Sequence, residues 1–115
     1  MEIVLEIPIK IKVTDKDLMD ILSIAFEGGI NYWCKSYDRH GKFAFTLYDA
    51  ESDDKWNFDK DDLIRGIKQY ILNSEDKWSI LDTNNDEVYI EPAFIDAWIA
   101  DDIIQYACMG RVIFG

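Results

Sequence analysis

The sequence contains few of the side chains that enzymes use for nucleophilic or acid–base catalysis. His40 is the only histidine, and it stands in a glycine-containing turn beside Asp38, Arg39 and Lys42. A Ser-His-Asp or Cys-His arrangement would have to use this residue, and a solvated turn position suits neither. Gly28-Gly29 lacks the lysine and the preceding strand of a phosphate-binding loop. We therefore predict that the chain is not an enzyme and has no catalytic residues.

Metal ligation is the second kind of chemistry that the residue spacing suggests. Asp82-x-Asn84-x-Asp86 has the oxygen spacing that begins a calcium-binding loop. The rest of the loop is missing, because Glu87 stands where glycine is required and Ala93 stands where a bidentate glutamate is required. Cys34 and Cys108 stand in neither a CxxC nor a CxxH spacing, and their apolar neighbours favour buried packing. We predict an Asn/Asp-rich turn, no metal ion and no other cofactor.

The acids are numerous and unevenly distributed. The net charge is −11, from 23 acidic and 12 basic side chains. Residues 49–62 contain seven acids and two lysines, and residues 78–110 contain seven acids and neither lysine nor arginine. This charge repels nucleic acid and anionic membranes, so we predict no direct binding to either and a partner protein with a basic surface. The predicted partner-binding surface consists of Asp49, Glu51, Asp53, Asp54, Asp61, Asp62, Asp86, Glu87 and Glu91.

Two interpretations of the acidic surface stay open. Carboxylates at about phosphate spacing can occupy a groove that is built for a nucleic-acid duplex, so the surface could mimic nucleic acid. Alternatively, the charge only keeps the protein soluble. A disordered acidic tail is excluded, because 49% of the residues are hydrophobic and four are tryptophan.

The length of 115 residues suits a single domain, 1–115. The N-terminus has no basic segment followed by an apolar run, and no apolar stretch approaches the roughly 20 residues that span a bilayer. We expect a cytoplasmic protein with reduced thiols, either monomeric or homodimeric.

Hydrophobic periodicity predicts an α+β fold, with a small mixed or antiparallel sheet and about three helices packed on it. Alternation over 3–13 predicts a strand, which Pro8 makes an edge strand or a bulged one. Helices are predicted over 15–27, 60–73 and 93–109. The first begins with a capping box at Thr14 and Asp17, and we expect a left-handed cap at Gly28-Gly29 to end it.

Shorter elements are predicted between and after the helices. Residues 30–34 suit either a helical turn or a strand, and a turn at 38–41 leads to a strand over 43–49. An acidic hairpin tip at 51–55 and a returning strand at 56–58 follow. Asp59 caps the second helix. We predict a loop at 78–85, a strand at 87–90, and a terminal strand at 111–114 after Gly110.

Asp101 is an acid in an otherwise apolar helical stripe. The stripe consists of Phe94, Ala97, Trp98, Asp101, Ile104 and Cys108. A buried aspartate must find a hydrogen-bond donor, which Gln105, Tyr32 or the amides after Gly28 could supply. Asp101 is therefore either a structural anchor or a ligand contact.

Two stretches of the sequence resemble a known family. Residues 26–34, FEGGINYWC, are similar to an ALEGGINYWC-like stretch in a group of small bacteriophage proteins. Residues 100–110, ADDIIQYACMG, are similar to the DIIQYALFGEIVYG-like stretch with which proteins of the same group end. The chain departs from the pattern at Phe26, at Cys108-Met109 and at Arg111. The resemblance implies a phage or prophage origin. Small acidic accessory proteins of phages often inhibit host defence systems, and among them are anti-CRISPR proteins that mimic DNA.

These observations leave three hypotheses about function. The first is a stoichiometric, anti-CRISPR-like inhibitor of a host defence protein, which acts through the acidic surface. The second is a protein that sequesters a nucleotide-like signal in a pocket formed by Gly28, Gly29, Asn31, Tyr32, Trp33, Asp101, Gln105 and Tyr106. The third is a structural or assembly accessory protein without a ligand.

Overall fold

The computed structural model describes residues 9–115, so most of the strand predicted over 3–13, Pro8 included, lies outside the described residues. The described end of that segment is β1 (Ile11–Lys12), which pairs in parallel with β6 (Glu87–Ile90). β6 also pairs in antiparallel fashion with β5 (Leu81–Asn84). β1 is therefore an edge strand of a sheet with the order β1-β6-β5.

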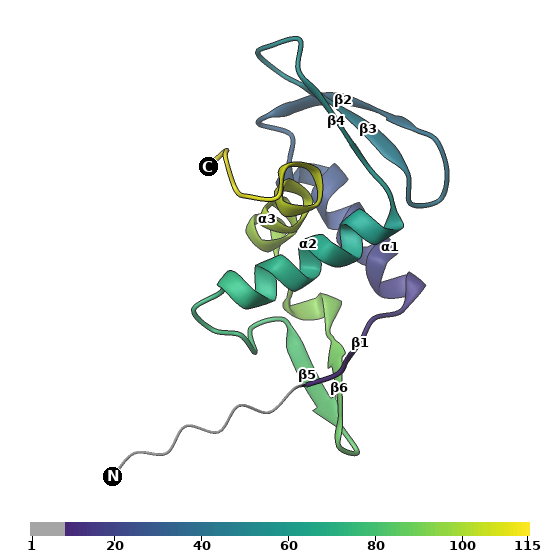
Figure 1. Ribbon diagram of the computed structural model, residues 1–115, viewed down its shortest axis with the longest axis vertical. Helices are drawn as coiled ribbons and strands as arrows, with labels where there is room; N and C mark the ends of the chain where they lie inside the picture. Colours follow the sequence, from purple (N-terminus) through teal and green to yellow (C-terminus); the bar gives the residue numbers. More distant parts are fainter. Residues whose placement is uncertain (1–8) are drawn as a thin grey trace.

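A second sheet contains β2 (Cys34–Arg39), β3 (Phe45–Asp49) and β4 (Lys55–Phe58), paired in this order and antiparallel throughout. Figure 1 shows the two sheets at opposite ends of the long axis. Between them lie α1 (Asp15–Ile24), α2 (Lys60–Asn73) and α3 (Ala97–Met109). The predicted α+β class with three helices is confirmed, and the strands form two small sheets.

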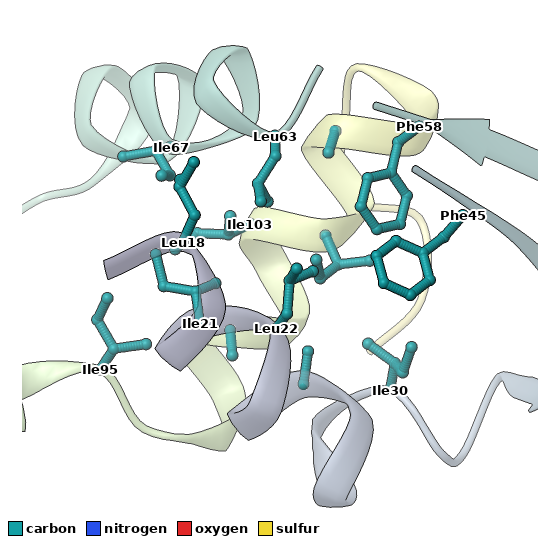
Figure 2. Packing of buried hydrophobic residues seen from close by; sticks show 14 of the residues in the cluster. Leu18, Ile21, Leu22, Ile30, Phe45, Phe58, Leu63, Ile67, Ile95 and Ile103 are labelled. Carbon is teal, nitrogen blue, oxygen red and sulfur yellow. The ribbon is translucent and has the colours of Figure 1, made fainter. Parts of the chain in front are cut away.

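The core lies where the three helices meet. Figure 2 shows Leu18 and Ile21 of α1 facing Leu63 and Ile67 of α2, with Ile103 of α3 beside them. Aromatic rings of β3 and β4 cover the end of this core that faces the second sheet. Gly66 permits the close approach of α2 to α3, because a Cβ at this position would lie 2.6 Å from the carbonyl oxygen of Ile103.

The helix N-termini follow the predicted capping. The Thr14 hydroxyl accepts from the backbone N–H of Asp17, and the Asp17 carboxylate accepts from that of Thr14. Asp59 and Asp62 form the same reciprocal pair at α2, whose bounds agree with the prediction. Each pair satisfies two backbone donors that a helix leaves without partners.

The end of the first helix differs from the prediction. α1 continues as a π-helical turn, η1 (Ala25–Gly29), and Gly28 has an extended φ of 173°. The expected left-handed cap at Gly28-Gly29 is therefore wrong. Gly29 has another role, because a Cβ there would lie 2.8 Å from the carbonyl oxygen of Ala97 and would push α3 away. Residues 30–33 form a turn, and β2 begins at Cys34.

Three further boundaries differ from the predictions. β2 continues to Arg39, so the turn predicted at 38–41 begins at His40. The predicted loop at 78–85 contains β5, whose first residue is buried against the core. The third helix begins later, because Pro92–Phe94 forms a 3-10 turn, η2, and the Asp96 carboxylate caps α3 by accepting from the N–H of Ile99.

The C-terminal segment also differs from the prediction. Gly110 ends α3 in the left-handed conformation, with φ 74°, as expected. Residues 111–114 form no strand. Their backbone is held by a side chain of α3, as described below.

Candidate functional site

A buried carboxylate joins α3 to the turn that follows η1. Asp101 is 3% exposed. Its Oδ1 accepts from the indole Nε1 of Trp33 at 2.7 Å and from Nε2 of Gln105 at 2.9 Å, and its Oδ2 accepts from the Tyr32 hydroxyl at 2.5 Å. The predicted donors Tyr32 and Gln105 are confirmed, and the Trp33 indole is a third donor that periodicity did not identify. Asp101 therefore anchors the turn to α3.

Gln105 extends this network to the end of the chain. Its Oε1 accepts from the backbone N–H groups of Ile113 and Phe114, both at 2.8 Å, and its Nε2 also donates to the Phe114 carbonyl at 3.1 Å. The Phe114 ring stacks on Trp33, with ring centroids 5.1 Å apart. These contacts satisfy the backbone that a terminal strand would have paired, and they close the core over Trp33.

A depression of about 240 Å³ lies above the network, between η1 and the start of α3. It is lined by Gly28, Gly29, Tyr32, Ala97, Trp98 and Asp101. We call it the η1–α3 depression. Tyr32 is 53% exposed and Trp98 is 77% exposed, so both aromatic residues are open to a partner.

Only part of the predicted pocket lines the η1–α3 depression. Gly28, Gly29, Tyr32 and Asp101 line it as expected. Trp33 and Gln105 are buried beneath it, where a ligand cannot reach them. Asn31 lines a different hollow, and Tyr106, although half-buried, does not line the depression.

The prediction did not include Ala97 and Trp98 as lining residues, because it assigned both to the apolar stripe of the third helix. Trp98 belongs to that stripe within α3 itself, but it lies in the first turn of the helix, where it stays exposed. Ile95 points into the core instead, as Figure 2 shows, and Phe94 and Trp98 are exposed. The cap signal of Asp96, one residue before Ala97, could have shown that Phe94 precedes the helix and that Trp98 lies in its first turn.

The electrostatics of this region are negative. Burial, the hydrogen bond to Asp101 and its negative charge raise the pKa of the Tyr32 hydroxyl. Burial and the negative charges of Asp101 and Asp96 raise the pKa of the Asp102 carboxyl. The ion pairs among residues 9–115 involve Asp15, Asp20, Asp62 and Glu87, so Asp101 has hydrogen-bond donors but no cationic partner in this part of the chain.

The predicted acidic surface is divided between two ends of the molecule. Figure 1 places the β3–β4 turn, with exposed Glu51, Asp53 and Asp54, at one end of the long axis. The β5–β6 turn, with Asp86 and Glu87, lies at the other end. These two groups of carboxylates therefore do not form one continuous row.

Several of the predicted surface acids have local partners. Asp49 is buried and accepts from the Ser52 hydroxyl at 2.6 Å and from the Glu51 N–H at 3.1 Å, which lowers its pKa and organises the turn. Asp62 pairs with Arg65 at 2.8 Å. Glu87 pairs with Lys12 at 2.7 Å, and Glu91 is half-buried. Asp61 is exposed.

Neither His40 nor the two cysteines form a catalytic arrangement within the described part of the chain. The Thr46 hydroxyl donates to Asn57 at 2.5 Å, so Nε2 of His40, 2.7 Å away, is the donor to Thr46 and not its base. Cys34 and Cys108 are free thiols, and burial raises the pKa of both, that of Cys108 to about 12. A thiol with a raised pKa is a poor nucleophile.

The described residues form neither a metal-binding cluster nor a membrane-spanning helix. Residues 9–115 contain no group of three or more His, Cys, Asp or Glu side chains that could hold a metal ion. Among the same residues, the helices are too short or too polar to span a membrane. The Asn85-Asp86 turn, with φ of 51° and 65°, joins β5 to β6 as an ordinary tight hairpin connection.

Comparison of the chain with protein-family models, with curated proteins and with solved structures gave no significant match. The resemblance to the bacteriophage proteins therefore stays a prediction.

Proposed function

We propose that this chain acts by binding a partner protein through the η1–α3 depression and the acidic surface around it, and not by catalysis. The observation that carries the proposal is the exposure of Trp98. A tryptophan that is 77% exposed loses the favourable burial of a large apolar ring. Tryptophan and tyrosine are enriched at the centres of protein interfaces, where they contribute most of the binding energy.

The charge of the same region indicates the kind of partner. Exposed Asp96 and half-buried Asp102 lie at or near the start of α3, and residues 78–110 contain no lysine or arginine. Such a surface accelerates association with a basic surface and repels acidic competitors. The resemblance to phage accessory proteins makes a host defence protein the proposed target, with the chain as a stoichiometric inhibitor.

The chemistry of the depression favours a protein partner over a nucleotide-like signal. Its lining contains no basic side chain, and its charged member is the carboxylate of Asp101, which repels phosphate. Its volume of about 240 Å³ also lies below the range, about 300 Å³ and upward, of most small-molecule sites. The acids of the β3–β4 turn contribute charge that steers the partner toward the protein. Mimicry of a long nucleic-acid duplex is less favoured than this role, because the two acidic ends of the molecule are far apart.

Capture of partners from a bacterial host, with matched tryptophan variants as bait, tests the proposal. Trp78 is also exposed, at 49%, but does not line the depression, so Trp78→Ala is the control for Trp98→Ala. We expect one or more basic host proteins to be retained by the wild-type chain and by Trp78→Ala, and to be lost with Trp98→Ala. Retention should weaken as salt increases, because the steering charges are exposed.

Charge reversal tests the contribution of the acidic turn. Asp53→Lys with Asp54→Lys changes two exposed side chains that have no ion pair among the described residues, so the fold should stay intact. Association should slow, while dissociation changes little. Partner retention that neither Trp98→Ala nor higher salt reduces would refute the proposed function.

A further inference from the structure

We propose that the η1–α3 depression is a receptor for one arginine side chain on the surface of the partner protein. This inference rests on the proposed function and specifies the group that the site recognises. Three independent features of the described residues support it: the aromatic lining, the uncompensated negative charge, and the orientation of a helix end.

The aromatic lining provides faces on which a guanidinium group stacks. Tyr32 and Trp98 both line the depression, and both residues are more than half exposed. A cation within about 6 Å of such a ring is attracted by its negative face, most strongly by tryptophan. Arginine is the cation that best uses this geometry, because its planar group is weakly hydrated and stacks on aromatic rings.

The carboxylate of Asp101 provides the opposite charge. A buried carboxylate is costly unless a positive charge balances it, and its three donors, Tyr32, Trp33 and Gln105, are all neutral. They fill three of the roughly four acceptor positions of a carboxylate, so one position can still accept a hydrogen bond. A guanidinium in the depression would supply both the charge and the donor.

The helix ends that border the depression also favour a cation. Gly28 and Gly29 end the π-helical turn η1, which follows α1 with a kink at Gly28, and the last carbonyls of a helix carry a partial negative charge. The last turns of α1 and η1 contain no basic side chain that would neutralise this charge. The N-terminal end of α3 has the opposite polarity, but the Asp96 carboxylate caps it.

The size and the polarity of the depression distinguish one side chain from larger ligands. About 240 Å³ accommodates a long side chain that enters from the surface. Anionic ligands would face Asp101 without a basic residue in the lining. A side chain presented by a partner also leaves its peptide backbone outside, where the surrounding acids steer the rest of the basic surface.

NMR titration with blocked amino acids tests this inference directly. The probes are N-acetyl-arginine amide, N-acetyl-lysine amide and N-acetyl-citrulline amide, the last being the neutral analogue of arginine. We expect the arginine probe to shift the indole N–H signals of Trp98 and Trp33 saturably, and to bind about tenfold more tightly than citrulline. Trp98→Ala should lose about tenfold in affinity, and Trp78→Ala should lose none.

Several outcomes would overturn the inference. Equal binding of the citrulline probe would remove the role of charge, and equal binding of the lysine probe would remove the preference for a guanidinium. Tighter binding of free arginine than of the blocked probe would indicate a metabolite site. Failure of the arginine probe to shift the Trp98 signal would overturn the inference of an arginine site. If Trp98→Ala still abolishes capture of the partner in that case, the proposed function stands. Arginine binding without a captured partner would instead contradict the proposed function.

Discussion

Replacement of Asp101 by alanine is the most informative test of the network. The change removes the acceptor of three donors, but their situations differ. Tyr32 is half exposed and can donate to water, and Gln105 still donates a hydrogen bond to the Phe114 carbonyl. Trp33 is buried, and its indole N–H loses the partner at 2.7 Å. An unsatisfied buried donor costs about 1–3 kcal/mol, and hydrogen bonds to a charged group contribute about 1.5–3 kcal/mol each.

Removal of a buried charge offsets part of this loss, so we expect Asp101→Ala to lower the free energy of unfolding by about 2–3 kcal/mol. Urea unfolding followed by tryptophan fluorescence measures it, and the midpoint should fall by about 1–2 M. Asp102→Ala, the neighbouring acid, is the control and should not lower the free energy of unfolding, because the ionised Asp102 carboxyl itself destabilises the fold.

A double-mutant cycle separates the indole hydrogen bond from general damage to the helix. Trp33→Phe keeps an aromatic ring against Phe114 but removes the N–H. If the unpaired donor accounts for part of the cost, Trp33→Phe should cost less in the Asp101→Ala background than in the wild type, with a coupling of about 1 kcal/mol. Additive effects, or an Asp101→Ala cost no larger than that of Asp102→Ala, would refute this reasoning.

Two further predictions concern packing and pH. Gly66→Ala should destabilise the protein by about 1–3 kcal/mol in thermal or urea unfolding, because the new Cβ would meet backbone atoms of α3 that cannot move independently; a neutral effect would contradict the close contact. The folded state raises the pKa of Asp102 above its unfolded value, so ionisation of this carboxyl destabilises the fold as pH rises through the folded pKa. Asp102→Asn should therefore be more stable than the wild type near neutral pH, and the difference in unfolding free energy should vanish as pH falls and Asp102 protonates. A difference that grows toward acid pH would contradict this prediction.

Local signals predicted several elements because the residues that define them are adjacent in sequence. α2 is the clearest example, since Asp59 and Asp62 mark its start and its apolar periodicity continues to Asn73. The buried Asp101 was predicted for the same reason, because an acid in an apolar helical stripe requires donors. Gly110, in the left-handed region, ended α3 where expected.

The remaining features depend on contacts between distant residues. β5 begins with one buried leucine followed by polar residues, so its strand conformation comes from pairing with β6 and not from alternation. The C-terminal segment was predicted as a strand, but a glutamine side chain satisfies its backbone from within α3. The exposure of Trp98 could not be predicted from periodicity, because it depends on whether another part of the chain covers the first turn of α3.

The partners of the Asp101 network are far apart along the chain. Tyr32 and Trp33 precede Asp101 by 69 and 68 residues, and Gln105 follows Tyr32 by 73. At about 5–20 residues synthesised per second, both aromatic side chains leave the ribosome roughly 3–14 s before the carboxylate that holds them. Loop closure between them is also slow relative to local helix formation. During synthesis, α1 and α2 can therefore form before the junction exists, and the η1–α3 depression becomes able to recognise a partner only in the last step of folding.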